Sequence, residues 1–183
     1  YMSSLLNDGS VSFITAQSFI LQLPLPPIVH FLRTVWKITF ILLHNAVALV
    51  ILFLFFPQGF SWAPLLVIPG VFLGGAAMAG LALALAMLAT RFRDVPQVVS
   101  SVVQVSFYLT PIIWLPTAIP EQARGLLLTW NPFYHLLQVM RQPLLNVYPT
   151  VTEWLTALGI AVLFVAIGTA AYQWKRRKLA FWV

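Results

Sequence analysis

Side chains that usually carry catalysis are scarce and scattered in this sequence. The chain has no cysteine and only four carboxylates, which are Asp8, Asp94, Glu121 and Glu153. No two of them lie at a helical spacing that would pair them for general acid–base work. A glycine-rich phosphate loop followed by Lys-Ser or Lys-Thr is also missing, so the chain itself is not expected to bind ATP. The sequence predicts no catalytic residue and no cofactor in this chain.

The three histidines are far apart and have no cysteine or acidic residue nearby, which argues against a metal site. His44 is the unusual one, because it lies with Asn45 inside a long apolar segment. Polar side chains at membrane depth often line a path or contact a neighbouring helix. His44 is therefore a candidate for a substrate path, and a neutral histidine bonded to an adjacent helix is the alternative.

A second group of polar and aromatic residues follows in the chain. Phe107, Tyr108 and Trp114 lie near Gln104 and Thr110. An aromatic face suits the C–H face of a sugar ring, and nearby polar groups suit its hydroxyls. The alternative is an aromatic belt at the membrane interface. We name as substrate-path candidates Gln104, Phe107, Tyr108, Trp114 and His44.

Long uncharged stretches must position these side chains. The chain of 183 residues is 61% hydrophobic and 8% charged, whereas a soluble domain carries roughly 25% charged residues. A stretch of about 20 apolar residues crosses the hydrocarbon core as a helix. The sequence predicts an all-α membrane protein, a helical bundle forming one transmembrane domain over residues 1–183. The predicted spans are residues 28–56, 62–90, 95–115 and 152–174. Pro111 is expected to break the third of these near its far end.

Residues 1–27 are expected to lie at the membrane surface in large part. Residues 7–10 form a predicted turn or cap. From about residue 10 to residue 23, apolar side chains recur at a spacing of three to four, which predicts a short amphipathic helix. Pro24 and the two prolines after it end that helix.

Residues 116–150 interrupt the pattern of spans, because they are apolar but carry several charges and prolines. Two short helices, residues 120–129 and 132–145, would form a re-entrant hairpin with its bend at Asn131-Pro132. In the second predicted span, residues 62–90, Gly70 and Gly74 form a G-x-x-x-G pair that permits close helix packing. The general abundance of glycine in membrane helices is the simpler explanation of that pair.

The basic residues lie mostly at span ends. If residues 91–94 and the C-terminus share one side, only Arg124 and Arg141 of the ten Lys and Arg residues lie on the other. The positive-inside rule then places the C-terminus in the cytoplasm and the hairpin outside. This explains the net charge of +6 without a nucleic-acid partner.

Several motifs together resemble a known family. They are LQLPLP before a span that contains His-Asn, the run RFRDVPQVVSSVVQVSFYLTPIIW from Arg91, and the run WNPFYHLLQVMRQPLLN from Trp130. The chain resembles the permease subunit of type-2 ABC exporters. It is most similar to permeases that export bacterial polysaccharides such as O-antigen, capsule and teichoic acid.

The resemblance implies half of a homodimeric channel in the bacterial inner membrane, with a lipid-linked polysaccharide as cargo. A separate cytoplasmic ATP-binding subunit would hold ATP and Mg²⁺. The family has six spans, a cytoplasmic coupling helix and two short outer re-entrant helices. Residues 10–23 would be the coupling helix and residues 116–150 the outer hairpin. Residues 1–6 would end the second span, so the sequence is expected to be N-terminally incomplete.

The resemblance also suggests roles for individual residues. Contacts with the ATPase are expected from Asp8, Phe13, Gln17, Arg91, Arg93 and Asp94. An outer gate is expected from Trp130, Phe133, Tyr134, His135 and Arg141. Two alternative functions remain, namely an exporter of drugs or other lipids, and a membrane-embedded enzyme or scaffold.

Overall fold

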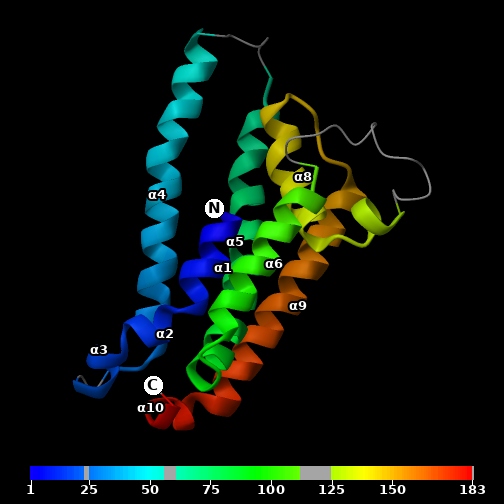
Figure 1. Ribbon diagram of the computed structural model, residues 1–183. Coiled ribbons are helices and arrows are strands. Elements are labelled where there is room, and N and C mark those ends of the chain that lie inside the picture. Colours follow the sequence, from blue (N-terminus) through cyan, green and yellow to red (C-terminus); the bar gives the residue numbers. More distant parts are fainter. Residues whose placement is uncertain (23–24, 56–60, 112–124, 183) are drawn as a thin grey trace.

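The computed structural model describes residues 1–22, 25–55, 61–111 and 125–182, and regular structure in these ranges is entirely helical (Figure 1). The elements are α1 (Met2–Ser10), α2 (Ser12–Thr15), α3 (Gln17–Gln22), α4 (Ile28–Phe55), η1 (Ala63–Leu66), α5 (Val67–Arg91), α6 (Val95–Leu109), the π-helical turn η3 (Gly125–Thr129), α8 (Pro132–Leu144), α9 (Val151–Lys175), η4 (Arg176–Lys178) and α10 (Leu179–Trp182). The prediction of an all-α membrane bundle is confirmed.

Three stretches of helix in the described ranges are long and apolar enough to cross a bilayer. They are Ile28–Phe55, Ala63–Arg91 and Val151–Lys178. Their bounds lie close to three of the four predicted spans. Each holds at least 18 residues of high mean hydropathy, and their backbone groups are bonded within the helix, as a hydrocarbon environment requires.

The remaining predicted span, residues 95–115, was expected to be broken near its far end at Pro111, and the observed helix ends just before that proline. Helix α6 has 15 residues, which is about 22 Å of rise and less than the roughly 30 Å of a hydrocarbon core. It ends at Leu109 because Thr110 is extended, as expected for a residue that precedes a proline. The predicted candidate Trp114 lies outside the described residues.

Helix α5 forms the centre of the bundle, and small residues let two neighbours, α8 and α9, approach it closely. A β-carbon at Gly70 would lie 2.5 Å from the Val139 carbonyl oxygen of α8, and one at Gly80 would lie 2.6 Å from Val165 of α9. A β-carbon at Gly168 of α9 would collide with the Gly80 carbonyl oxygen. The predicted close packing at Gly70 is confirmed, and its partner is the hairpin helix α8.

Helix α4 stands to one side of the bundle and packs mainly on α1 and α2 (Figure 1). Its buried side chains, His30, Phe31 and Ile38, all lie in its first half. The second half is exposed and almost wholly apolar, which suits contact with lipid.

The N-terminal segment differs from its prediction. Residues 7–10 are helical rather than a turn, because α1 continues to Ser10 and buries Leu5, Leu6 and Gly9. A β-carbon at Gly9 would lie 2.8 Å from Ala82, so only glycine fits that position against α5. The amphipathic helix expected over residues 10–23 is divided at Ala16 into α2 and α3.

The two ends of the bundle carry different elements. Helices α2, α3 and α10 and residues 91–94 lie at one end, while η1, η3 and α8 lie at the other (Figure 1). Within the predicted hairpin, α8 confirms the helix expected over residues 132–145. The first hairpin helix is described only from Gly125.

Candidate functional site

Helix α6 carries a stripe of exposed polar side chains along one face. The stripe consists of Gln97, Ser101, Gln104 and Tyr108, which are all exposed. Their spacings of four, three and four residues keep them on one side of a helix. We call these four residues the polar stripe; it contains two of the substrate-path candidates, Gln104 and Tyr108.

Most of the remaining surface of α6 is apolar, with Ser100 and Ser106 as the exceptions. Val99 and Val103 are buried against the bundle, whereas an adjacent flank of Val98, Val102 and Val105 is exposed. Hydrocarbon suits that flank but not the amides of the polar stripe, because an amide in lipid loses its hydrogen bonds with water. The polar stripe therefore needs water, a second protein surface or a polar ligand beside it.

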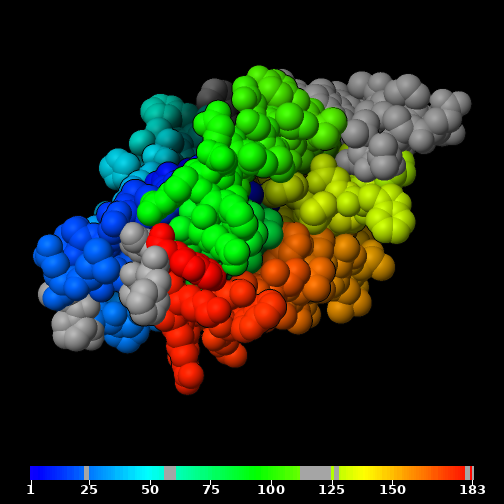
Figure 2. Space-filling view, turned by 60° about the horizontal axis from the view of Figure 1, so that its bottom comes forward, coloured from blue at the N-terminus to red at the C-terminus, as the bar shows by residue number. Residues whose placement is uncertain are grey.

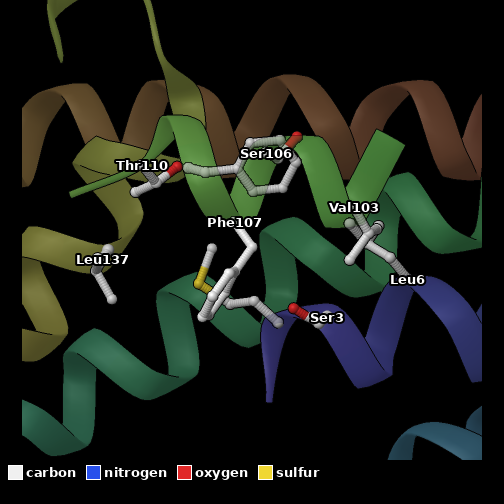
Figure 3. A pocket seen from close by; sticks show the side chains of 9 residues that line it. Ser3, Leu6, Val103, Ser106, Phe107, Thr110 and Leu137 are labelled. Carbon is white, nitrogen blue, oxygen red and sulfur yellow. The ribbon is translucent and has the colours of Figure 1, made fainter. Parts of the chain in front are cut away.

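A small pocket connects α6 with α1 and α8 (Figure 3). Its volume is about 60 Å³, and its lining includes Phe107 of α6, Phe133 of α8 and Ser3 of α1. The Phe107 side chain extends from α6 toward the end of α1 that carries Ser3. The structure thus brings a path candidate, Phe107, to the same pocket as a gate candidate, Phe133. The pocket is far smaller than the roughly 300 Å³ or more of typical ligand sites, so it is a packing gap rather than a sugar site.

Asn131 joins the end of α6 to the start of α8. Its Nδ2 donates to Thr110 Oγ1 at 3.1 Å, and its Oδ1 accepts from the backbone N–H groups of Phe133 at 3.0 Å and Tyr134 at 3.3 Å. The second pair of bonds is an N-cap, which satisfies donors that a helix start leaves free. The predicted bend at Asn131-Pro132 is confirmed, and Pro132 occupies the first turn.

Arg141 strengthens the same junction. Its Nη1 donates to the Pro111 carbonyl oxygen at 2.9 Å, and both Thr110 and Pro111 are buried. The Thr-Pro of one motif and the Asn-Pro and Arg of the other are therefore in direct contact. Sequence reasoning missed Thr110, Pro111 and Asn131 as a unit, although all three stood in the motifs. We call Thr110, Pro111, Asn131 and Arg141 the α6–α8 junction.

The remaining gate candidates lie around the start of α8. His135 Nε2 lies 2.9 Å from the Thr129 carbonyl oxygen, and the rings of Tyr134 and His135 meet edge to face at 5.6 Å. Trp130 is 81% exposed. These contacts join residues that are close in the sequence. The structure therefore places the gate candidates at the end of the bundle that carries α8, but it does not bring all of them into contact with one another.

Glu153 links α8 to α9. Its Oε1 accepts from Gln142 Nε2 at 2.6 Å, and its Oε2 accepts from the Thr150 backbone N–H at 2.7 Å. Thr150 and Glu153 form a capping box at the start of α9. This carboxylate is structural.

The coupling candidates are divided between two places. Asp8 of α1 pairs with Lys37 of α4 at 3.3 Å, and Gln17 is exposed. Phe13 was expected to contact the ATPase directly, and its position in the structure corrects that expectation. It is fully buried, with its ring 6.2 Å from that of Phe31 and 6.5 Å from that of Tyr172. It packs α2 onto the bundle, so it can affect a partner only through the position of α2.

The other coupling candidates, Arg91, Arg93 and Asp94, are exposed at the same end of the bundle as α2 and α3. His44 is exposed on the second half of α4, and the structure does not bring it to the polar stripe. His44 has no hydrogen bond with another described residue, so the bonded alternative finds no partner within this part of the chain.

Comparison with known protein families identifies the family of this chain. Residues 7–145 match the ABC-2 type transporter family, and this match includes α2, α3, α4, α5, the polar stripe and the α6–α8 junction. The chain belongs to the ABC-2 type transporter family. A search of curated proteins found no match. As an ABC-2 membrane subunit, the chain is the permease component of a transporter, and its family implies an ATP-binding partner and a membrane environment.

Proposed function

We propose that this ABC-2 membrane subunit exports a lipid-linked polysaccharide across the bacterial inner membrane. Two copies would enclose the path, and a separate cytoplasmic subunit would bind and hydrolyse ATP. The C-terminus would lie in the cytoplasm and α8 at the outer surface. This orientation puts the basic link and tail inside, as the positive-inside rule favours.

The polar stripe on α6 is the observation that supports this proposal most strongly. The amides of Gln97 and Gln104 both donate and accept hydrogen bonds, as sugar hydroxyls do. Tyr108 is 64% exposed, and its ring meets that of Phe107 edge to face at 5.7 Å. An aromatic face next to amides is suited to sugar rings and poorly suited to lipid chains. Two such stripes facing each other would line a path that excludes hydrocarbon.

The α6–α8 junction couples the start of α8, at the outer end of the proposed path, to movement of α6. Because Asn131 and Arg141 bind α8 to residues 110–111, a shift of α6 displaces the aromatic residues at the start of α8. At the opposite end, α2, α3 and residues 91–94 form a surface for the ATP-binding subunit. A partner that prefers one arrangement of these elements when it holds ATP would shift the population toward that arrangement.

The test replaces the polar stripe and leaves the apolar flank as its control. The double variant Gln104→Leu with Tyr108→Ala removes an amide and the exposed ring. Val105→Leu changes the neighbouring exposed flank of the same helix. We expect the double variant to lower surface polysaccharide at least about tenfold at an equal protein level, because roughly 1.4 kcal/mol of lost interaction gives that factor. Val105→Leu is expected to export normally.

Unchanged export by the double variant would exclude the polar stripe from the path. Loss of drug resistance with normal surface polysaccharide would assign the stripe to a drug exporter instead. Transport activity of the purified chain without any ATP-binding subunit would contradict the proposed division of labour.

A further inference from the structure

The indole ring of Trp182 gathers cationic side chains from two distant segments. The Arg91 guanidinium carbon lies 5.6 Å from the ring centroid, and the Lys175 Nζ lies 5.9 Å from it. Arg93 also donates from Nη2 to the Trp182 carbonyl oxygen at a long 3.5 Å. Figure 2 shows the C-terminal segment beside the segment that contains residues 91–94. The last described helix therefore closes against the end of α5.

These contacts concentrate positive charge. We call Arg91, Arg93, Lys175, Arg176, Arg177 and Lys178 the basic cluster. In the part of the chain that the structure describes, none of the six has a carboxylate within ion-pair distance, and Asp94 pairs with none of them. Like charges at such proximity repel one another. A bound anion would relieve that repulsion, and Arg176 and Arg177 are exposed residues that could meet it.

The position of the basic cluster indicates which anion is within reach. It lies where two span-length helices end, Ala63–Arg91 and Val151–Lys178. Trp174 is 79% exposed one residue before Lys175, and the Lys175 Nζ lies 4.2 Å from its ring centroid. Exposed tryptophan at the end of a span is typical of the headgroup region of a bilayer. The anionic groups at that depth are phospholipid phosphates.

We propose that the basic cluster is a binding site for the headgroup of an anionic phospholipid. Arg91 and Lys175 supply the principal donors, and Trp182 holds them next to each other. The site is independent of the polar stripe on α6 and of the exported cargo, and it shares Arg91 and Arg93 with the edge of the surface proposed for the ATP-binding subunit. Trp182 acts as a positioning residue, because its ring orients the two cations without offering a charge of its own.

The experiment titrates the purified full-length chain in neutral detergent with phosphatidylglycerol and follows binding by native mass spectrometry. Phosphatidylcholine and inorganic phosphate are the two comparison probes. The variants are Arg91→Gln with Lys175→Gln, and Trp182→Leu. Arg33→Gln is the matched control, because Arg33 also lies over an aromatic ring, at 5.8 Å from Phe19, but outside the basic cluster.

We expect phosphatidylglycerol to bind in preference to both comparison probes. The charge variant is expected to weaken that binding by about 25-fold, since each basic residue near an anionic surface contributes roughly fivefold. Trp182→Leu should weaken it by severalfold without changing net charge, and Arg33→Gln should leave it unchanged. Circular dichroism of each variant checks that the helices remain formed, and Arg176→Gln with Arg177→Gln provides a second charge variant at exposed positions.

Three results would overturn the proposal. Equal binding of phosphatidylglycerol by the wild type and both charge variants would show that the basic cluster is not the site. An equal loss of phosphatidylglycerol binding in Arg33→Gln would show that binding depends on net charge alone and not on the basic cluster. Inorganic phosphate that competes as well as the lipid would show that the site takes free phosphate rather than a headgroup.

Discussion

Asn131 uses both ends of one amide to hold two helices. Its oxygen caps α8, and its nitrogen reaches the Thr110 hydroxyl of the segment that ends α6. Thr110 is buried, so the donor that faces it has little water to replace the bond. This residue therefore contributes to both local and long-range structure, and the two contributions can be separated by mutation.

Thr110→Val removes the link to Asn131 and keeps the cap. We expect it to lower the free energy of unfolding by about 1 kcal/mol, because a buried amide donor loses its partner. Asn131→Ala removes link and cap together and should cost about 2 kcal/mol. Thermal unfolding of the purified protein in detergent measures both. Equal losses in the two variants would argue that the cap contributes nothing.

Arg141 makes a charge-assisted bond to a buried carbonyl oxygen, so its removal should be costly. We expect Arg141→Met to lower the free energy of unfolding by about 1.5–3 kcal/mol, the range for hydrogen bonds to charged groups. Lys37→Met is the matched control, because the Lys37–Asp8 pair is largely exposed and such pairs contribute about 0–1 kcal/mol. Chemical denaturation of both variants gives the comparison. A larger loss in Lys37→Met would contradict the assigned role of Arg141.

At the scale of the elements, the contact between α5 and α9 is the most extensive one between described helices. It depends on two glycines, Gly80 and Gly168, whose backbones approach until neither position has room for a side chain. Membrane helices gain van der Waals contact from such an approach, since lipid provides no hydrophobic drive between them. The result is a rigid pair of spans around which α1, α6 and α8 are arranged.

Gly168→Leu should separate α5 from α9. We expect it to lower the free energy of unfolding by about 3 kcal/mol or to prevent folding, because an overpacked side chain must displace backbone. Gly159→Leu lies on the same helix, where a β-carbon meets nothing within 4 Å. The control should change stability little. Yield of monodisperse protein and its melting temperature test this, and equal stability of the two variants would contradict the observed packing.

At the scale of the whole molecule, the exposed surface of α6 suggests where a second copy lies. The polar stripe is unsuited to lipid, and two copies that face each other would remove it from hydrocarbon. The chain contains no cysteine, so single cysteines can be introduced without a background.

We expect Gln104→Cys to form covalent dimers in membranes with a short bis-maleimide, because the proposed path is flanked by α6 from both copies. Val162→Cys, exposed on α9, is the control and should remain monomeric. Denaturing gel electrophoresis gives the result. Dimers through Val162 alone would place the second copy against α9 and away from the polar stripe.

Much of the molecule could be predicted residue by residue from local signals. The bend at Asn131-Pro132, the helix that follows it and three span-length helices all follow from turn residues and from apolar runs. The end of α6 just before Pro111 could also be predicted, because a proline cannot continue the backbone hydrogen bonding of a helix. The prediction of a turn over residues 7–10 was wrong. Burial of Leu5 and Gly9 against α5 keeps this segment helical despite its turn-forming residues.

The sequence by itself determined that the protein lies in a lipid bilayer and where its helices are. A long apolar run can enter lipid only if its backbone groups bond one another within the helix, and that requirement is local. Only the tertiary structure decided which residues meet. Thr110 and Asn131 lie 21 residues apart, and Arg93 and Trp182 lie 89 apart. The periodicity of the sequence cannot predict these contacts. They depend on how closely α8 and α9 pack against α5 at Gly70 and Gly80. The buried position of Phe13 and the gathering of cations around Trp182 follow from that packing.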